Sequence, residues 1–341
     1  MFAFSFRPRF ASPLVAAGLA AVIATFPSPA RAANLLGDGA VVDAARGVAY
    51  VAQPQGGIEA LDLSTGKAVW RSAVAAKPLA LVGEGLLAQE EPGIGGALRV
   101  ATLDVATGRE EMRSELALPV GLAATVTDNL RGTFRIRAAV LEGGGGTVVL
   151  AWIATVAAPL RGFLPPDLSR APAGAPAVVS APAARAGGFR RGAARFDPAT
   201  GRLTPVADAE AASLAAAIDR NLAPGGSAEV SGASGTPGLP SIDGRHALTS
   251  ERVAGSFHTY RWSISDRATG AVLAVLDAPV SFAPFVVAGP KVIYLAQPSM
   301  RRENGVTIRQ ELRLRALDLS TGAESWQAVV RDSAYRGPVP P

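Results

Sequence analysis

The chain has 341 residues, with 37 glycines, 26 prolines, no cysteine and a formal net charge of +5. A chain without cysteine has neither a disulfide framework nor a lipidated cysteine anchor. Three arginines and no acidic residue lie in residues 1–32, so the remainder carries a formal charge of +2. Charge therefore gives no reason to expect a nucleic-acid partner.

Residues 1–32 have the order of a secretory signal peptide. Arg7 and Arg9 precede an apolar run from Leu14 to Phe26, and Ala30-Arg31-Ala32 supplies a small-x-small cleavage site. A signal anchor is the alternative, but the apolar run is shorter than the roughly 20 residues that span a bilayer. We expect cleavage near Ala32/Ala33, a periplasmic or secreted protein, and no transmembrane segment after cleavage.

A five-residue motif, Asp-x-x-Thr-Gly, recurs five times along the rest of the chain. Its Asp can bond to backbone N–H groups two or three residues on, and its Gly can adopt the positive φ that closes a hairpin turn. We therefore interpret the motif as a structural turn. The defining residues are Asp62, Thr65, Gly66, Asp104, Thr107, Gly108, Asp197, Thr200, Gly201, Asp266, Thr269, Gly270, Asp318, Thr321 and Gly322.

Short alternating segments surround each motif and predict four strands per repeat. One strand precedes the turn and one follows it, and alternation with a period of two indicates a strand with one face buried. Two further strands lie upstream of each turn. The predicted upstream pairs are 40–43 and 48–52, 79–82 and 86–89, 134–137 and 148–152, 241–242 and 246–249, and 285–288 and 292–296.

Repeats of four strands predict an all-β fold, a β-propeller of four-stranded antiparallel blades. Five blades are recognisable and five or six are expected in total, over residues 33–336. We expect an insertion loop at 160–188, because that segment is rich in Ala and Pro and lacks alternation. A helical insertion is expected at 208–222, and residues 337–341 form an extended tail.

The sequence around two of the turns resembles the repeat of pyrroloquinoline-quinone (PQQ)-type propellers, the quinoprotein alcohol dehydrogenase-like family. Residues 58–70 and 316–326 fit its pattern A-x-D-x-x-T-G-x-x-x-W, ending at Trp70 and Trp326. The other three copies keep the turn but lack the Trp. The resemblance implies a propeller in which both tryptophans pack between blades.

The same resemblance implies two functional branches. Its quinone-dependent dehydrogenases have about eight blades, clamp the quinone against a vicinal disulfide, and hold Ca²⁺ with Glu, Asn and Asp. The non-catalytic branch includes the lipoprotein of the outer-membrane β-barrel assembly machinery, which needs a lipidated cysteine. This chain can supply neither cysteine feature, and we expect it to belong to the non-catalytic branch and to need no cofactor.

Other candidate sites have simpler interpretations. His246 and His258 lie in or beside one repeat, and we favour solvated or core-edge histidines over a metal site. We favour structural turns over Ca²⁺ loops for the five motif Asp residues. Gly143–Gly146 lacks the Lys and helix of a phosphate loop and is expected to be a hairpin turn. No Ser has the setting of a triad nucleophile.

Arginines gather at two places that we expect to be loops. Arg185, Arg190, Arg191 and Arg195 lie at the end of the long insertion, and Arg301 and Arg302 lie in the fifth repeat. A solvated surface is the simpler interpretation. The alternative is contact with an acidic partner, peptidoglycan or lipid headgroups.

These observations predict a non-enzymatic scaffold that binds envelope proteins or a small-molecule ligand. Residues 160–188 and 208–222 are the expected contact segments, because binding usually lies on propeller loops. Two alternatives are a PQQ-dependent oxidoreductase with an atypical site and a subunit of an outer-membrane assembly or secretion complex. Pull-down and quinone binding distinguish them.

Overall fold

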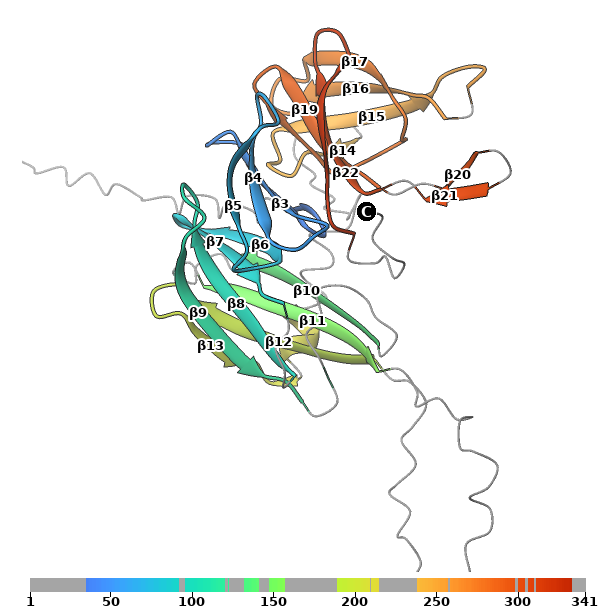
Figure 1. Cartoon of the computed structure of the whole chain (residues 1–341). Helices are drawn as coiled ribbons and strands as arrows, with labels where there is room; N and C mark the ends of the chain where they lie inside the picture. The colour runs from blue at the N-terminus through green and yellow to red at the C-terminus, as the bar shows by residue number, and fades with distance from the viewer. Residues whose placement is uncertain are drawn as a thin grey trace, which may run out of the picture.

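The computed structural model is built almost wholly of β-strands (Figure 1). It describes residues 35–91, 96–119, 122, 132–140, 147–156, 189–208, 210–214, 238–256, 258–297, 300–303, 306–309 and 311–332. No helix in these ranges is long and apolar enough to cross a membrane.

Five antiparallel sheets follow one another along the chain, and we number them as blades 1 to 5. Blade 1 is β1 (Leu35–Gly37), β2 (Ala40–Asp43), β3 (Val48–Ala52), β4 (Ile58–Asp62) and β5 (Ala68–Ser72). Blade 2 is β6 (Lys77–Val82), β7 (Gly85–Gln89), β8 (Ala97–Asp104) and β9 (Glu110–Ala117). Blade 3 is β10 (Gly132–Val140), β11 (Val148–Val156), β12 (Phe189–Asp197) and β13 (Arg202–Pro205).

The last two blades follow the same plan. Blade 4 is β14 (Leu239–Pro240), β15 (His246–Arg252), β16 (Tyr260–Asp266) and β17 (Val272–Ala278). Blade 5 is β18 (Phe285–Ala288), β19 (Lys291–Ala296), β22 (Arg313–Asp318) and β23 (Glu324–Val329). A two-stranded ribbon, β20 (Met300–Glu303) and β21 (Val306–Arg309), lies between β19 and β22 in the chain. The predicted all-β architecture of antiparallel blades is confirmed, with four strands in blades 2 to 5 and an additional short strand, β1, in blade 1.

Alternation within each strand gives every blade two faces, and most faces are buried against another blade. In β17, for example, Ala274, Leu276 and Ala278 are buried while Leu273, Val275 and Asp277 are exposed. A single four-stranded sheet cannot bury both faces by itself, so stacking of neighbouring blades supplies the hydrophobic core.

Four shared cores set the order of the blades as 4, 5, 1, 2, 3. Trp262 and Tyr294 belong to the core between blades 4 and 5, and Leu61 and Ile293 to that between blades 5 and 1. The other two cores join blade 1 to blade 2 and blade 2 to blade 3. The last blade therefore packs on the first. In Figure 1, blades 2 and 3 lie below blade 1 and blade 4 lies above it.

Blade 3 does not share a core with blade 4 within the described residues. Its second face instead packs Val149, Ala151 and Ala193 against Val206, Ala211 and Leu214. In the part of the chain that the structure describes, the stack of blades is thus open between the third and fourth repeats rather than between its first and last.

Several local predictions need correction. The first strand of blade 4 is Leu239–Pro240, and Ser241 to Gly244 form the following turn, so the predicted strand at 241–242 is placed too late. Arg190, Arg191 and Arg195 lie in β12, and Arg301 and Arg302 in β20, rather than in loops. The arginines interrupt the apolar alternation, so the start of β12 and the whole of β20 were assigned to loops.

Other predictions concern residues that lie wholly or partly outside the described ranges. Residues 208 and 210–214 of the predicted helix have helical backbone, and the Ala211 amide donates to the Ala207 carbonyl at 2.8 Å; residues 215–222 lie outside. So do residues 1–32, 160–188, Gly143–Gly146, Arg185 and the tail 337–341.

Candidate functional site

Each of the five Asp-x-x-Thr-Gly motifs forms a turn between the last two strands of its blade. In the first, Asp62 Oδ1 accepts hydrogen bonds from the Thr65 amide and hydroxyl, both at 2.8 Å. The Gly66 amide donates to the Asp62 carbonyl at 2.7 Å, and Gly66 has a φ of 70°. In all five turns the Asp carboxylate accepts the Thr hydroxyl.

The turn carboxylates accept hydrogen bonds from groups of their own turns. Within the described residues, no three His, Asp or Glu side chains are placed to share a metal ion. His246 Nδ1 lies 3.9 Å from Asp243 Oδ1, and His258 is exposed on the loop before β16. Each motif carboxylate thus closes its own turn.

Hydrogen bonds to the turn carboxylates lower their pKa values. The pKa of Asp318 falls to about 2, chiefly because the Ser320 hydroxyl donates to it, followed by the amides of Thr321 and Ser320. The pKa values of the other four motif Asp residues are lowered as well, each by hydrogen bonds within its own turn.

The Asp318→Asn substitution is expected to make stability less dependent on acid pH. A carboxyl whose pKa is lower in the folded state stabilises the fold above its unfolded pKa of about 3.9. That contribution is lost as the pH falls toward the folded value of about 2. Urea unfolding between about pH 5 and pH 2 measures it. Ser320→Ala should weaken the dependence in the same direction, and unchanged pH dependence in both variants would contradict the assignment.

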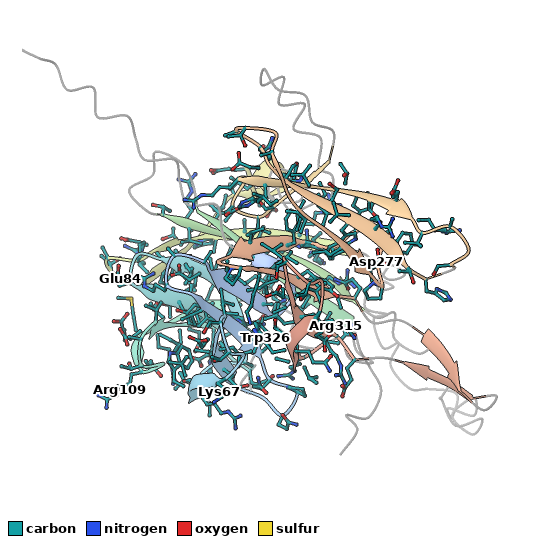
Figure 2. The ribbon with its side chains drawn as sticks, turned by 90° about the horizontal axis from the view of Figure 1, so that it is seen from above. Lys67, Glu84, Arg109, Asp277, Arg315 and Trp326 are labelled. Atoms are coloured by element: carbon teal, nitrogen blue, oxygen red, sulfur yellow. The ribbon has the colours of Figure 1, made fainter. Side chains whose placement is uncertain are left out.

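Trp70 and Trp326 each cover the turn glycine of another blade. Trp70 donates from Nε1 to the Val105 carbonyl at 2.9 Å and lies against Gly108 of blade 2. Trp326 donates to the Leu63 carbonyl at 2.9 Å and lies against Gly66 of blade 1. Figure 2 shows Trp326 where the ribbons of blades 5 and 1 meet. Trp326 thus joins the ends of the repeat array across 263 residues of sequence.

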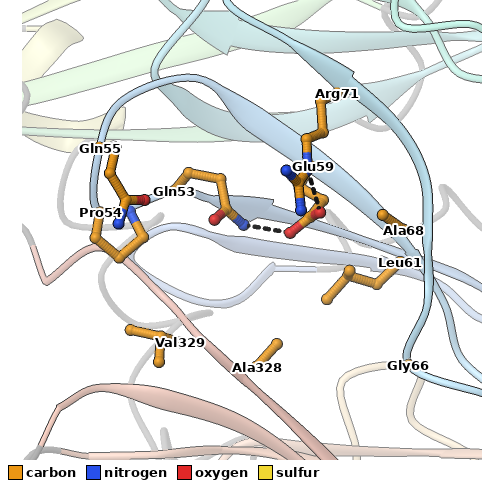
Figure 3. A pocket seen from close by; sticks show the side chains of 10 residues that line it. All are labelled: Gln53, Pro54, Gln55, Glu59, Leu61, Gly66, Ala68, Arg71, Ala328 and Val329. Carbon is orange, nitrogen blue, oxygen red and sulfur yellow. Dashed lines mark hydrogen bonds and ion pairs between the residues drawn. The ribbon is translucent and has the colours of Figure 1, made fainter.

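A groove of about 310 Å³ opens beside this junction (Figure 3). One wall is the blade 1 surface around Glu59 and Arg71, and the other is Ala328 and Val329 of β23. The remaining lining comes from Gln53, Pro54, Gln55, Leu61, Gly66 and Ala68. A ligand in this groove would contact the first and last blades together.

A buried carboxylate and an exposed guanidinium give the groove its chemistry. The Glu59 side chain is 8% exposed and accepts from Gln53 Nε2 at 2.7 Å and from Arg71 Nε at 2.6 Å. Arg71 itself is 74% exposed, and its two terminal nitrogens have no partner among the described residues. Glu59 therefore holds the guanidinium in place through Nε, while the terminal N–H groups of Arg71 stay available to an anionic group.

Sequence reasoning did not identify this groove. Glu59 stands in the alternating strand before the first turn, and neither Glu59 nor Gln53 belongs to a sequence motif. A Glu two residues before a buried Leu of the core strand was the available signal. The contribution of Ala328 and Val329 depends on how blade 5 meets blade 1.

Comparisons with known proteins find only weak similarities. No family model matches the sequence, and no curated protein does. Solved structures that resemble it include BamB from Moraxella catarrhalis, at 16% identity and a TM-score of 0.24 over 85% of this chain and 62% of that one. A quinohemoprotein alcohol dehydrogenase from Pseudomonas putida HK5 has 13% identity and a TM-score of 0.24 over 85% of this chain and 58% of its own.

A third structure is described as the Dos1 propeller, at 9% identity and a TM-score of 0.24, with 84% of this chain and 69% of that chain covered. The chain thus spans under two thirds of the BamB chain's length. Similarity this low does not extend to activity. The assignment of blades follows from the strand order and shared cores of the chain itself.

Proposed function

We propose that this protein is an exported, non-enzymatic propeller-type scaffold that binds a partner polypeptide at the cell envelope. The groove between blades 5 and 1 is the proposed binding site. The observation that carries the proposal is the guanidinium of Arg71, which is fixed through Nε by Glu59 and is directed outward with 74% of the side chain exposed.

The geometry favours an acidic side chain or a C-terminal carboxylate as the group that binds. A guanidinium held by one carboxylate still presents parallel N–H donors, which match a second carboxylate in a bidentate arrangement. Gln55 and the backbone beside Pro54 lie in the same lining and offer further polar contacts. Export is supported by the sequence of residues 1–32.

Replacing Arg71 with Gln is expected to reduce recovery of the partner from envelope extract at least about tenfold, which corresponds to roughly 1.4 kcal/mol. Gln can still donate to Glu59, so the fold should be kept while the cation is lost. The matched control is Arg109→Gln, an exposed arginine on the turn of blade 2, outside the groove. Pull-down with quantification of the bound protein makes the measurement.

Two results would contradict the proposal. One is equal recovery of the partner by the wild type and the Arg71→Gln chain. The other is saturable binding of PQQ with Ca²⁺ in calorimetry, without any stoichiometric protein partner, which would favour the oxidoreductase alternative. Thermal unfolding of both variants verifies that each remains folded.

A further inference from the structure

At four of the five turns, a side chain of the adjoining blade covers the motif glycine. Trp326 covers Gly66, and Trp70 covers Gly108. Met112 of blade 2 covers Gly201 in blade 3, and Leu276 of blade 4 covers Gly322 in blade 5. The turn glycine is thus a recurring point of contact, against which a side chain of the adjoining blade packs.

The fifth turn, Asp266 to Gly270 in blade 4, lacks this cover. Gly270 has the same positive φ, 73°, and no described atom lies within 4 Å of the position its Cβ would occupy. This turn faces the opening between blades 3 and 4. If the five blades formed a closed ring in the order given above, blade 3 would pack against this turn.

The sequence differs at the same junction. The residue before the motif Asp is Ser265 in blade 4, whereas it is Leu61, Leu103, Phe196 and Leu317 in the other blades. On the facing side, the residue two before the motif Asp is Arg195 in blade 3, where the others have Ala60, Thr102, Ile264 and Ala316. Serine and arginine at these positions do not favour a dry contact between blades 3 and 4.

Exposed aliphatic side chains lie next to the uncovered turn. Among the described residues, five large apolar side chains are exposed, and Val272, Leu273 and Val275 are three of them. All three belong to β17, the outer strand of blade 4. Val275 is paired with Ser263 in register, so it lies on the same face as Ser265. A cluster of exposed apolar residues beside an empty contact is typical of a protein-binding surface.

We infer that the Asp266–Gly270 turn of blade 4 is a seat for a tryptophan side chain of a partner protein. The two indoles at the equivalent turns show the geometry. A Cβ added to the turn glycine would lie 2.5 to 2.6 Å from the nearest indole atom. Each indole also donates from Nε1 to the carbonyl of the residue after the motif Asp. In blade 4 that residue is Arg267, and β17 supplies apolar surface beside it.

The indole must come from another protein. The chain has four tryptophans, and each of them already packs against another part of the chain. Trp70 and Trp326 cover turns, Trp152 lies against Gly192, and Trp262 is buried with Nε1 bonded to the Val280 carbonyl. A second copy of this chain would have to give up one of these contacts to fill the seat. The seat is separate from the Arg71 groove, and neither proposal depends on the other.

The test is NMR of the full chain with ¹⁵N-glycine labelling, titrated with N-acetyltryptophanamide. The Gly270 amide peak is identified by its absence from the Gly270→Asn variant, since Asn tolerates a positive φ. We expect a saturable shift of that peak. The peak of Gly289 should not move; it has a φ of 56° and an equally open surrounding, and Gly289→Asn identifies it.

N-acetylalaninamide is the matched ligand control and should leave the Gly270 peak in place. An unmoved Gly270 peak, or an equal shift with N-acetylalaninamide, would overturn the inference. The Arg71→Gln chain should give the same indole-dependent shift as the wild type, so failure of the groove proposal and failure of this one are distinguishable.

Discussion

The Trp326→Ala substitution is expected to lower the free energy of unfolding by about 3 kcal/mol, the usual loss for removing a large packed aromatic. Trp326 contributes its ring to the core between blades 5 and 1 and its Nε1 to the Leu63 carbonyl. Its removal leaves a cavity over Gly66 and an unpaired carbonyl at the contact between the first and last blades. Equilibrium unfolding in urea measures the change.

Val69→Ala is the control for this substitution. Val69 lies on the outer strand of blade 1 and is 54% exposed, so its truncation should change stability by less than about 0.5 kcal/mol. A loss below about 1 kcal/mol for Trp326→Ala, comparable to a surface change, would mean that the indole does not join the two blades.

The Gly66→Ala substitution is expected to cost about 3 kcal/mol, from two sources. A Cβ at φ 70° is strained by about 1–2 kcal/mol. The same Cβ would lie 2.6 Å from Trp326 Cγ, so the indole must move, and forced overpacking costs about 1–3 kcal/mol. The measurement is again unfolding in urea.

Gly47→Ala separates the two sources. Gly47 has nearly the same φ, 68°, but nothing lies within 4 Å of its Cβ position. It should show the backbone strain alone, about 1–2 kcal/mol. Equal losses for Gly66→Ala and Gly47→Ala would contradict the contact between Gly66 and Trp326.

The blades could be predicted from sequence because their signals are local. The motif from Asp62 to Gly66 contains both the capping carboxylate and the positive-φ glycine within five residues, and the strands beside it alternate. The order of the blades in space could not be predicted, because cores such as that of Leu61 and Ile293 join residues far apart in the chain. Arg190 and Arg191 were assigned to the end of the insertion loop rather than to β12, because they interrupt the apolar alternation of that strand.

The sequence itself distinguishes the open junction between blades 3 and 4. Aligning the five motifs places Ser265 where the other repeats have Leu or Phe, and Arg195 where they have smaller or apolar residues. Polar residues at these positions make a dry contact between blades 3 and 4 unfavourable. The groove at Glu59 had a weaker signal, because its second wall comes from β23 at the other end of the chain.

A double-mutant cycle between Trp326→Ala and Gly66→Ala tests the central claim, that blade 5 closes onto blade 1. If the indole covers Gly66, then Gly66→Ala made in the Trp326→Ala background should lower the free energy of unfolding by little more than the backbone strain. The cycle should then give a coupling of about 2 kcal/mol, within the range for residues in contact. The cycle of Trp326→Ala with Gly108→Ala, whose glycine meets Trp70 instead, should be additive within about 0.5 kcal/mol. Additivity in the Trp326 and Gly66 cycle would contradict closure at this junction.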